Sequence, residues 1–428
     1  MAVVKPFNAM RFNEAKAGAL SDLVCPPYDI IPEKQREELI QKSKYNMVNL
    51  ELPKGENMYE DAAKTLKKWL NEGILKEDEK ENFYIYEEEF TVKGETKKIK
   101  GFMCLVRLEE LSKGVVLPHE ETLSKAKTDR FNLMSTTFCN FSQIYSLYID
   151  EVGQTKKVID KLSSKLADKD FKAGDGVIQR LWIADDKEEI EAIGKQFASR
   201  QLFIADGHHR YETALNFKKK LIEDGFIKDE NHKGNYVMMM LVDMDNEGLV
   251  VFPTHRLLKD LKGFDEKEII NKIQVYFDIE KKDNTSNIED ELSKFAQKKA
   301  FALYTGGEGY YLITLKDSSA VKKLMPEKSD AYCGLDVSIL HSLILEKIFG
   351  IDKENMAKQI NLAYTRDTDE AINGVKDKKY ECCFILNPTK VREIKDVALA
   401  GEKMPQKSTY FYPKIITGLV MNKIMDIL

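Results

Sequence analysis

Residues 202–215 change their hydrophobic pattern at one point, and that change limits what this part of the chain can fold into. Residues 202–205 form an unbroken apolar run, which ends at Asp206 and Gly207. From there the apolar residues follow helical spacing, through Tyr211, Ala214, Leu215, Phe217 and Leu221. The pattern therefore predicts a strand, a tight turn and the start of a helix.

The predicted helix start carries three basic side chains in a row, which are His208, His209 and Arg210. The first N–H groups of a helix have no partner inside the helix and the dipole is positive there, so this end attracts anions such as phosphate. Basic residues are disfavoured at this end unless an anion offsets them. Gly207 lets a ligand approach the backbone closely. We therefore predict a phosphate site at residues 207–210, although each residue alone also fits an ordinary solvated turn.

The segment Asp-Gly-His-His-Arg-Tyr-Glu-Thr-Ala at residues 206–214 resembles the phosphate-binding box of the ParB/sulfiredoxin superfamily, in which a Gly-x-x-Arg turn opens a helix. The chain is more similar still to one bacterial and archaeal family of that superfamily, the domain of unknown function numbered ten-fifteen. Five motifs in order carry the resemblance over most of the chain: Cys25-Pro-Pro-Tyr-Asp-Ile30, Leu117-Pro-His-Glu120 with Asp129-Arg130, the box, Pro253-Thr-His-Arg256, and Met404-Pro-Gln-Lys-Ser-Thr-Tyr-Phe-Tyr-Pro-Lys414.

The length of 428 residues exceeds that of one ordinary domain, so we expect two or three lobes. The resemblance implies a ParB/sulfiredoxin-like phosphate-binding domain over residues 1–255. We expect a second α/β domain over residues 256–428, whose C-terminal motif returns to the cleft of the first. The fold class is α+β, or mixed α/β. The net charge of −5 disfavours a general nucleic-acid binder, although a local basic cleft stays open.

Several elements can be predicted from hydrophobic periodicity. Residues 83–92 and 99–108 form a β-hairpin, and residues 236–243 form an apolar strand in the middle of a sheet. The sequence Gly-Gly-Glu-Gly at residues 306–309 is expected to join two strands as a turn, because no helix follows it. A closing helix is expected after Pro413.

The cysteines and the N-terminus point to the cytoplasm. Six cysteines show no metal-type spacing, so we expect reduced thiols. No signal peptide is visible at the N-terminus, and no apolar run reaches the length of a membrane span.

Further candidate residues lie in the other motifs. Pro26 and Pro27 hold the backbone before Tyr28 and Asp29 in an extended conformation. These two residues either form a wall of the cleft or only fasten a loop. Residues 115–130 are rich in ionisable groups and are either part of the site or a solvated charged loop. The ionisable candidates there are His119, Glu120, Asp129 and Arg130. Additional phosphate contacts are expected from His255, Arg256, Lys407, Ser408 and Thr409.

Two carboxylates compete for the role of general base. Glu120 follows a strand and the rigid Pro118, next to His119, and is the leading candidate for proton transfer. Asp206 is its rival, and is also a candidate helix cap or a ligand for Mg²⁺. Other chemistries are disfavoured. Adjacent His208 and His209 cannot chelate one zinc as an i, i+4 pair would, and the box has histidines where sulfiredoxins carry their catalytic cysteine.

Three functions remain open. The first is a phosphotransferase similar to the free-serine kinases, which uses ATP, ADP or pyrophosphate and Mg²⁺ on a small-molecule substrate. The second is a ParB-like, nucleotide-switched DNA-binding or regulatory protein, for which we find no basic helix-turn-helix. The third is a non-catalytic nucleotide sensor. We expect no membrane partner and no specific nucleic-acid partner, and a homodimer is compatible with the sequence.

Overall fold

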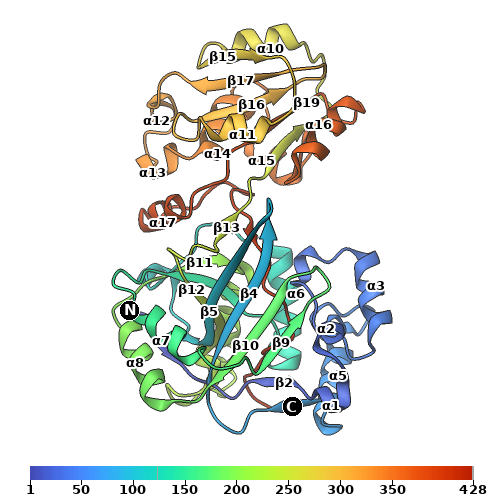
Figure 1. Cartoon of the computed structure of the whole chain (residues 1–428), viewed down its shortest axis with the longest axis vertical. Coiled ribbons are helices and arrows are strands. Elements are labelled where there is room, and N and C mark those ends of the chain that lie inside the picture. The colour runs from blue at the N-terminus through green and yellow to red at the C-terminus, as the bar shows by residue number, and fades with distance from the viewer. Residues whose placement is uncertain (123, 427–428) are drawn as a thin grey trace. The chain divides into compact units, whose positions relative to one another are not determined.

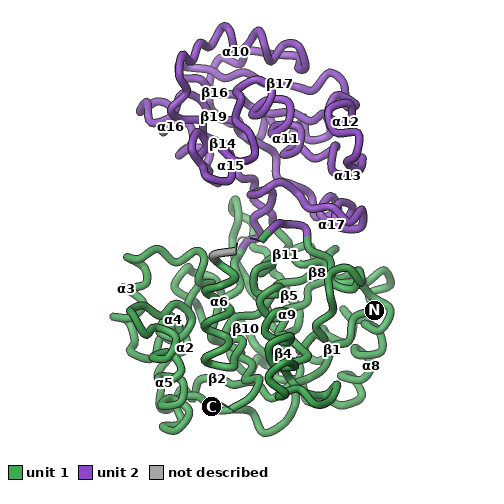
Figure 2. The backbone as a smooth tube through the Cα atoms, turned by 180° about the vertical axis from the view of Figure 1, so that it is seen from behind, with its two compact units in different colours: residues 1–118, 122–250, 413–428 green, residues 119–121, 251–412 purple. Residues whose placement is uncertain are grey.

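The computed structural model describes residues 1–122 and 124–426, apart from the side chains of residues 124 and 125. The chain divides into two compact units, which Figure 2 shows in different colours. Unit 1 holds residues 1–118, 122–250 and 413–428, and unit 2 holds residues 119–121 and 251–412. Both units combine helices with sheets, so the predicted α+β class is confirmed. That residues 1–255 and 256–428 are separate folding domains stays a prediction.

Unit 1 is built on a nine-stranded sheet (Figure 1). Its strands are β1 (Val4–Lys5), β4 (Phe83–Val92), β5 (Glu95–Arg107), β6 (Val116–Leu117), β8 (Ile144–Tyr148), β9 (Lys169–Lys172), β10 (Ile178–Ala184), β11 (Leu202–Asp206) and β12 (Tyr236–Asp243). They follow the order β6-β11-β8-β12-β5-β4-β10-β9, with β1 beside β5. β12 is parallel to β8 and β11 is parallel to β6, and the other pairs are antiparallel.

Unit 1 also contains helices, of which the last four contribute buried residues to the hydrophobic core of this sheet. The helices are α1 (Glu14–Ala17), α2 (Leu20–Leu23), α3 (Glu33–Lys42), α4 (Val48–Glu51), α5 (Met58–Asn71), α6 (Ser124–Thr137), α7 (Gln154–Leu162), α8 (Lys187–Phe197) and α9 (His208–Glu223). Alternate strand residues such as Phe102 and Met239 share one hydrophobic core with Ile193 of α8 and Phe217 of α9. Because strand side chains alternate between faces, α8 and α9 lie on the same face of the sheet.

The apolar strand predicted at residues 236–243 is confirmed as β12, which pairs with β5 on one side and β8 on the other. Its three methionines, Met238, Met239 and Met240, are buried and fill the core. The hairpin predicted for residues 83–108 is confirmed as β4 and β5, which are joined at Lys93 and Gly94.

Unit 2 has a six-stranded sheet in the order β15-β17-β16-β19-β14-β18. Its strands are β14 (His255–Leu258), β15 (Phe277–Lys282), β16 (Ala300–Tyr304), β17 (Tyr310–Leu315), β18 (Leu362–Thr365) and β19 (Cys382–Leu386). Its helices are α10 (Glu266–Ile273), α11 (Ile288–Ser293), α12 (Ala320–Leu324), α13 (Asp330–Cys333), α14 (Asp336–Ile339), a π-helix (Leu340–Glu346), α15 (Lys353–Lys358), α16 (Thr368–Lys376) and α17 (Val391–Leu399).

Both faces of this second sheet are covered. Along β16, Phe301 and Leu303 belong to one hydrophobic core, whereas Ala302 and Tyr304 belong to another. This alternation gives one core on each side of the sheet. The turn predicted at residues 306–309 is confirmed, because β16 and β17 pair antiparallel around it.

The closing helix expected after Pro413 is wrong. The described residues of this segment contain no helix, and β21 (Asn422–Lys423) pairs with β7 (Cys139–Asn140) of unit 1. Bridges also join Thr417 to Cys25 and Met421 to Met10. Gly418 has a φ of 100°, which a helix does not allow. Pairing with distant strands therefore overrides local helix formation here.

The remaining short strands are β2 (Met10–Phe12), β3 (Leu75–Glu77), β13 (Val250–Val251) and β20 (Phe411–Tyr412). Within the described part of the chain, no helix is long and apolar enough to cross a membrane.

Candidate functional site

The strand–turn–helix predicted around the box is confirmed in unit 1. β11 ends at Asp206, Gly207 has a φ of 94°, and α9 begins at His208. Gly207 is the N-cap residue and provides no side-chain cap, so Asp206 does not serve as the helix cap. Gly207 therefore offers no side-chain acceptor to the backbone N–H groups that open α9.

Gly207 and Arg210 lie against each other. A Cβ atom placed on Gly207 would be 3.0 Å from Nε of Arg210 and 3.1 Å from its Cζ and Nη2. The guanidinium therefore folds back over the turn and occupies the space that a side chain at position 207 would need. Its Nη1 donates a hydrogen bond to the Gln143 carbonyl. The side chain of Arg210 is only 10% exposed, which holds this charge in a fixed position.

Asp206 is bracketed by two cations. Its Oδ2 accepts a hydrogen bond from Nζ of Lys414 at 2.7 Å, and its Oδ1 lies 3.9 Å from Nη2 of Arg210. Burial raises the pKa of Asp206, but Lys414 and Arg210 outweigh it and hold the pKa below its usual range. Asp206 is therefore a carboxylate at neutral pH and a weak proton acceptor.

A second group of charges surrounds Arg130 on α6. Its Nη1 donates to the Glu51 carbonyl at 2.7 Å and lies 3.6 Å from the Glu51 carboxylate. Nε and Nη2 donate to Asp129 at 2.8 and 2.6 Å, and the guanidinium stacks 4.0 Å from the centre of the Tyr28 ring. Hydrogen bonding, ion pairing and stacking together hold this side chain, which is the role for which arginine is suited.

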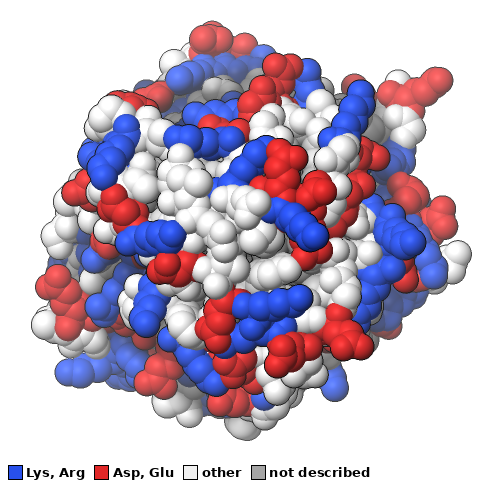
Figure 3. Space-filling model, turned by 90° about the horizontal axis from the view of Figure 1, so that it is seen from above, with Lys and Arg blue, Asp and Glu red and all other residues white. Residues whose placement is uncertain are grey.

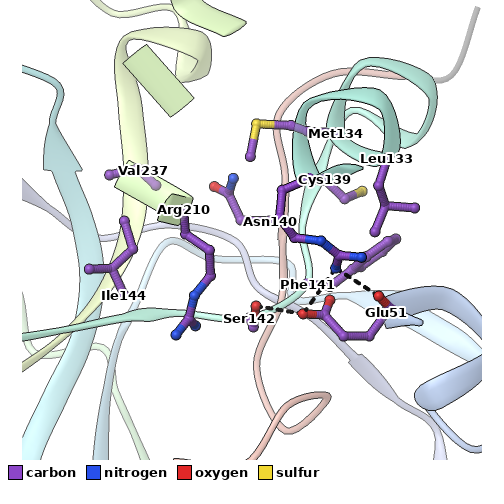
Figure 4. Close-up of a pocket in the computed structure, with 11 residues that line it drawn as sticks. Glu51, Leu133, Met134, Cys139, Asn140, Phe141, Ser142, Ile144, Arg210 and Val237 are labelled. Carbon is purple, nitrogen blue, oxygen red and sulfur yellow. Dashed lines mark hydrogen bonds and ion pairs between the residues drawn. The ribbon is translucent and has the colours of Figure 1, made fainter. Parts of the chain in front are cut away.

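Glu51 and Arg210 both line a small cavity of about 30 Å³ (Figure 4). Figure 4 shows Ser142 directed at Glu51, and its hydroxyl donates to Oε1 at 2.8 Å. Burial raises the pKa of Glu51, while Arg130, Ser142 and Arg210 oppose the rise. The cavity has room for one water molecule beside these polar groups.

Electrostatic effects connect the motif around Tyr28 to the box. Burial raises the pKa of Tyr28 to about 12, against the opposing influence of Arg130 and Arg210. Burial lowers the pKa of His209, while Asp29 opposes that change. His209 is therefore mainly neutral at pH 7. Unit 1 thus gathers the predicted residues Tyr28, Asp29, Asp129, Arg130 and Asp206–Arg210 in one charged region; their roles stay predictions.

Sequence reasoning missed Glu51, Ser142, Gln143 and Lys414 as members of this region. Lys414 stood inside the last quoted motif, and Glu51 is a single acid between Leu50 and Leu52. An acidic residue between two apolar residues can be recognised in the sequence as a candidate for burial. Because an ionised side chain is seldom buried without a partner, such a residue also indicates a polar partner nearby. Nothing local marks Ser142 or Gln143.

The other predicted site residues belong to unit 2. His119 and Glu120 lie in residues 119–121, and Nε2 of His119 is 3.1 Å from the Thr409 hydroxyl. The Ser408 hydroxyl donates to the Pro405 carbonyl, and Lys407 has a φ of 58°. The structure therefore brings the His119 ring together with Thr409. Their phosphate-binding and catalytic roles stay predictions.

His255 and Arg256 are also in unit 2, and both are fully buried. Nδ1 of His255 accepts from the Leu386 backbone at 3.3 Å, and its Nε2 is 3.1 Å from the Thr368 hydroxyl. Burial lowers the pKa of His255 to about 4. Arg256 donates to the Thr254 and Lys407 carbonyls. Both side chains are thus engaged by protein groups, and their proposed contact with phosphate stays a prediction.

The sequence was compared with family profiles and with known proteins. The profile described as "Protein of unknown function (DUF1015)" matches residues 4–338. The chain belongs to this family. A comparison with curated proteins finds no match.

Solved structures with similarity to the chain include three of different description. A conserved hypothetical protein from Pyrococcus furiosus is 16% identical, with a TM-score of 0.34, covering 73% of this chain and 94% of its own. A free serine kinase in complex with AMP is 13% identical, with a TM-score of 0.33 and coverages of 71% and 89%. SbnI from Staphylococcus aureus, truncated at its C-terminus, is 10% identical, with a TM-score of 0.35 and coverages of 75% and 87%. These scores do not establish the ParB/sulfiredoxin-like core, which stays a prediction.

Proposed function

We propose that the turn between β11 and α9 binds phosphate groups of a nucleotide or of pyrophosphate. The observation that carries this proposal is the position of the Arg210 guanidinium, which is folded over Gly207 at a helix N-terminus without a side-chain cap. A guanidinium has five N–H donors, and in the described structure one hydrogen bond from Arg210 is seen, to Gln143. Donors therefore remain for phosphate oxygens, next to backbone N–H groups that favour the same ligand.

We further propose that the protein transfers a phosphoryl group to a small hydroxyl-bearing molecule, with free serine as the leading acceptor. The acceptor oxygen forms a bond to phosphorus, the bond to the leaving phosphate oxygen breaks, and the hydroxyl proton passes to a carboxylate. We assign the role of proton acceptor to Glu120, which follows His119 in the chain. Asp206 is the weaker base, because its depressed pKa makes it hold a proton poorly near pH 7.

Mg²⁺ is the metal that this chemistry would use. In the described part of the chain, no group of three His, Cys, Asp or Glu side chains is placed to hold a metal ion. Mg²⁺ commonly keeps several waters and takes only one or two carboxylates together with phosphate oxygens. Asp206 is ionised and adjoins the turn, so it fits the role of that single carboxylate.

A non-catalytic nucleotide sensor is the second candidate, and one observation favours it. The carboxylates near the turn already have cationic partners: Asp206 pairs with Lys414, and Asp129 pairs with Arg130. Unit 1 therefore offers binding charge more readily than proton acceptors. For the ParB-like alternative, a DNA-binding or regulatory protein, we find no comparable observation.

One experiment separates these functions. The protein is incubated with Mg²⁺, a panel of free amino acids, and ATP, ADP or pyrophosphate, and products are followed by ³¹P NMR. Nucleotide affinity is measured in parallel for the protein, for Arg210→Ala and for Lys220→Ala. Lys220 is the matched control, because it removes a cation from the far end of α9, where it pairs with Asp224.

Phosphoserine formation that is lost in Arg210→Ala, but kept in Lys220→Ala, is the expected result. Charge-assisted contacts contribute about 1.5–3 kcal/mol, so Arg210→Ala should weaken phosphate-donor binding roughly tenfold or more. Tight nucleotide binding without transfer to any acceptor would favour the sensor. Equal affinity of Arg210→Ala and the unaltered protein would remove the proposed phosphate site.

A further inference from the structure

Unit 2 contains a cavity of its own, of about 230 Å³. The π-helix Leu340–Glu346, α13 and α15 line it, together with residues 403–406. α13 and α15 can be followed in Figure 1. A π-helix is rare and is often found at functional sites. The proposed phosphate turn lies in unit 1, so this cavity is not part of it.

Arg256 is a buried cation next to the lining of this cavity. Arg256 has no exposed surface, and no carboxylate of the described residues forms an ion pair with it. It donates to the carbonyls of Thr254 and Lys407, and its Nε has no hydrogen-bond partner. Burial lowers the pKa of Arg256 to about 10, so it still carries its charge at neutral pH. A buried charge without a counter-ion is costly, and an anion nearby would offset it.

His341 connects Arg256 to the cavity. Nη2 of Arg256 lies 3.2 Å from Nε2 of His341, and His341 lines the cavity. Burial lowers the pKa of His341, and the charge of Arg256 lowers it further, so the ring is neutral. Because Arg256 can only donate, Nε2 must accept and the ring proton must be on Nδ1. Among the described residues Nδ1 has no hydrogen-bond partner, so it is a donor available to a ligand.

Ser338 supplies a second donor. Its side chain is about 1% exposed and lines the cavity, yet its hydroxyl has no hydrogen-bond partner among the described residues. Tyr332 is close enough for Ser338 to lower the pKa of the Tyr332 hydroxyl by a hydrogen-bonding effect, but the two hydroxyls do not meet the geometry of a hydrogen bond. Ser342 differs, because its hydroxyl already donates to the Ser338 carbonyl at 2.7 Å. A buried, unsatisfied hydroxyl facing a cavity is unfavourable unless a ligand accepts from it.

The remaining lining fixes the ligand class. The other charged lining residues are of both signs: Lys328 lies 3.6 Å from Glu402, Lys353 opposes the burial-raised pKa of Glu346, and Lys403 and Glu121 also line the cavity. The apolar surface comes largely from Met325, Met356 and Met404, whose flexible side chains adapt to different shapes. The arrangement therefore combines a single buried positive charge, two neutral donors and an apolar wall.

We propose that unit 2 binds a small molecule with one carboxylate on an apolar body, whose carboxylate accepts hydrogen bonds from Ser338 and His341. The carboxylate is the counter-charge of Arg256, which acts through His341. A phosphate would bring nearly two negative charges, whereas Arg256 is a single buried charge without a carboxylate partner among the described residues. The apolar body contacts the methionines, which a free phosphate could not do.

The test uses the full chain and three probes: 4-methylpentanoate, its neutral amide 4-methylpentanamide, and inorganic phosphate. Calorimetric titration should give saturable binding of 4-methylpentanoate, binding of the amide at least about tenfold weaker, and no competition by phosphate. Ser338→Ala should weaken carboxylate binding several-fold while leaving the melting temperature of the free protein unchanged or higher. That combination is expected because the substitution removes an unsatisfied buried hydroxyl.

Ser342→Ala is the matched control. It removes a hydroxyl from the same wall, but one whose proton is already used, so carboxylate affinity should not change. Absence of saturable carboxylate binding would overturn the proposal. So would equal affinity for the amide, or an affinity that Ser338→Ala leaves unaltered, since the charge or the site would then be wrong.

Discussion

Gly207 and Arg210 form the turn as a pair, and this gives the first prediction. Gly207→Ala combines a positive φ with a Cβ atom about 3.0 Å from the Arg210 guanidinium. We expect it to destabilise the protein by about 1–2 kcal/mol and to weaken nucleotide binding roughly tenfold by displacing Arg210. Chemical denaturation and nucleotide titration measure the two effects.

Gly225→Ala is the control for this variant. Gly225 follows the other end of α9 with a φ of 76°, and a Cβ atom there would meet nothing within 4 Å. It should therefore show the stability loss of a positive φ without any change in nucleotide affinity. If both alanine variants lose affinity equally, the effect comes from destabilising α9 and not from Arg210.

Glu88 is a buried carboxyl group in unit 1. Tyr86 lies 2.9 Å from Oε1 of Glu88 and also contacts Oε1 of Gln179. One phenolic proton cannot serve both acceptors, so a protonated Glu88 explains the arrangement. Burial raises the pKa of Glu88 to about 8.

The second prediction follows from this raised pKa. Between about pH 4.5 and pH 8 the folded protein keeps a proton that the unfolded chain releases, so stability falls as pH rises. Glu88→Gln keeps the shape without the ionisation, and its stability relative to the unaltered protein should increase from pH 5 to pH 8 by on the order of 2–3 kcal/mol. Urea denaturation at both pH values measures this.

Glu89→Gln is the contrasting variant, because hydrogen bonds from Arg180 and Lys98 lower the pKa of Glu89. It should show no such pH-dependent gain between pH 5 and pH 8. A Glu88→Gln advantage that stays constant over this range would mean that Glu88 is ionised in the folded protein.

At the scale of single residues, the sequence pointed to residues 206–210 but not to Lys414, the cation that pairs with Asp206. Asp206, Gly207 and Arg210 could be chosen because a strand, a glycine and a helix start adjoin in the sequence. Lys414 pairs with Asp206 across 208 positions of the chain, and no local pattern encodes such a contact. Non-local ion pairs are set by tertiary packing, which periodicity does not report.

Among the elements, the closing segment differs most from expectation. All of its main apolar residues are buried, which are Ile415, Ile416, Leu419, Val420 and Met421. The segment therefore lacks the exposed face that a surface helix would have. Short strands and bridges fasten the segment to distant parts of unit 1. Elements with strong local periodicity, such as α9 and the β4–β5 hairpin, could be predicted. This one depends on partners that are remote in the sequence.

The third prediction concerns this segment. A chain that ends at Tyr412 should lose cooperative unfolding of unit 1, because five buried apolar side chains and the pairing of β21 with β7 are removed. Lys414→Met keeps the segment and removes only the partner of Asp206, so it should remain folded and lose about 1–3 kcal/mol at neutral pH. Circular dichroism during thermal unfolding distinguishes the two. A truncated chain with an unchanged unfolding transition would show that the segment is dispensable.

Over the whole molecule, charge and core organisation matter most. Lysines and arginines are interspersed with aspartates and glutamates on the face that Figure 3 shows, around an uncharged centre. This agrees with the small net charge of −5. Composition could therefore predict the surface character, whereas the division into units depends on which segments share a core.

Each unit has hydrophobic cores made of its own residues, and this gives the fourth prediction. The core around Phe102 and Met239 contains only residues of unit 1, and the two cores on either side of β16 contain only residues of unit 2. A fragment of residues 251–412 should therefore fold without the rest of the chain. It lacks His119, whose carbonyl accepts from Met404 at 2.8 Å and whose ring contacts Thr409. We expect this fragment to unfold in a cooperative thermal transition. The temperature of that transition should be lower than for a fragment to which residues 119–121 are rejoined by a short linker. A fragment of residues 251–412 with the far-ultraviolet spectrum of an unfolded chain would show that unit 2 requires unit 1 to fold.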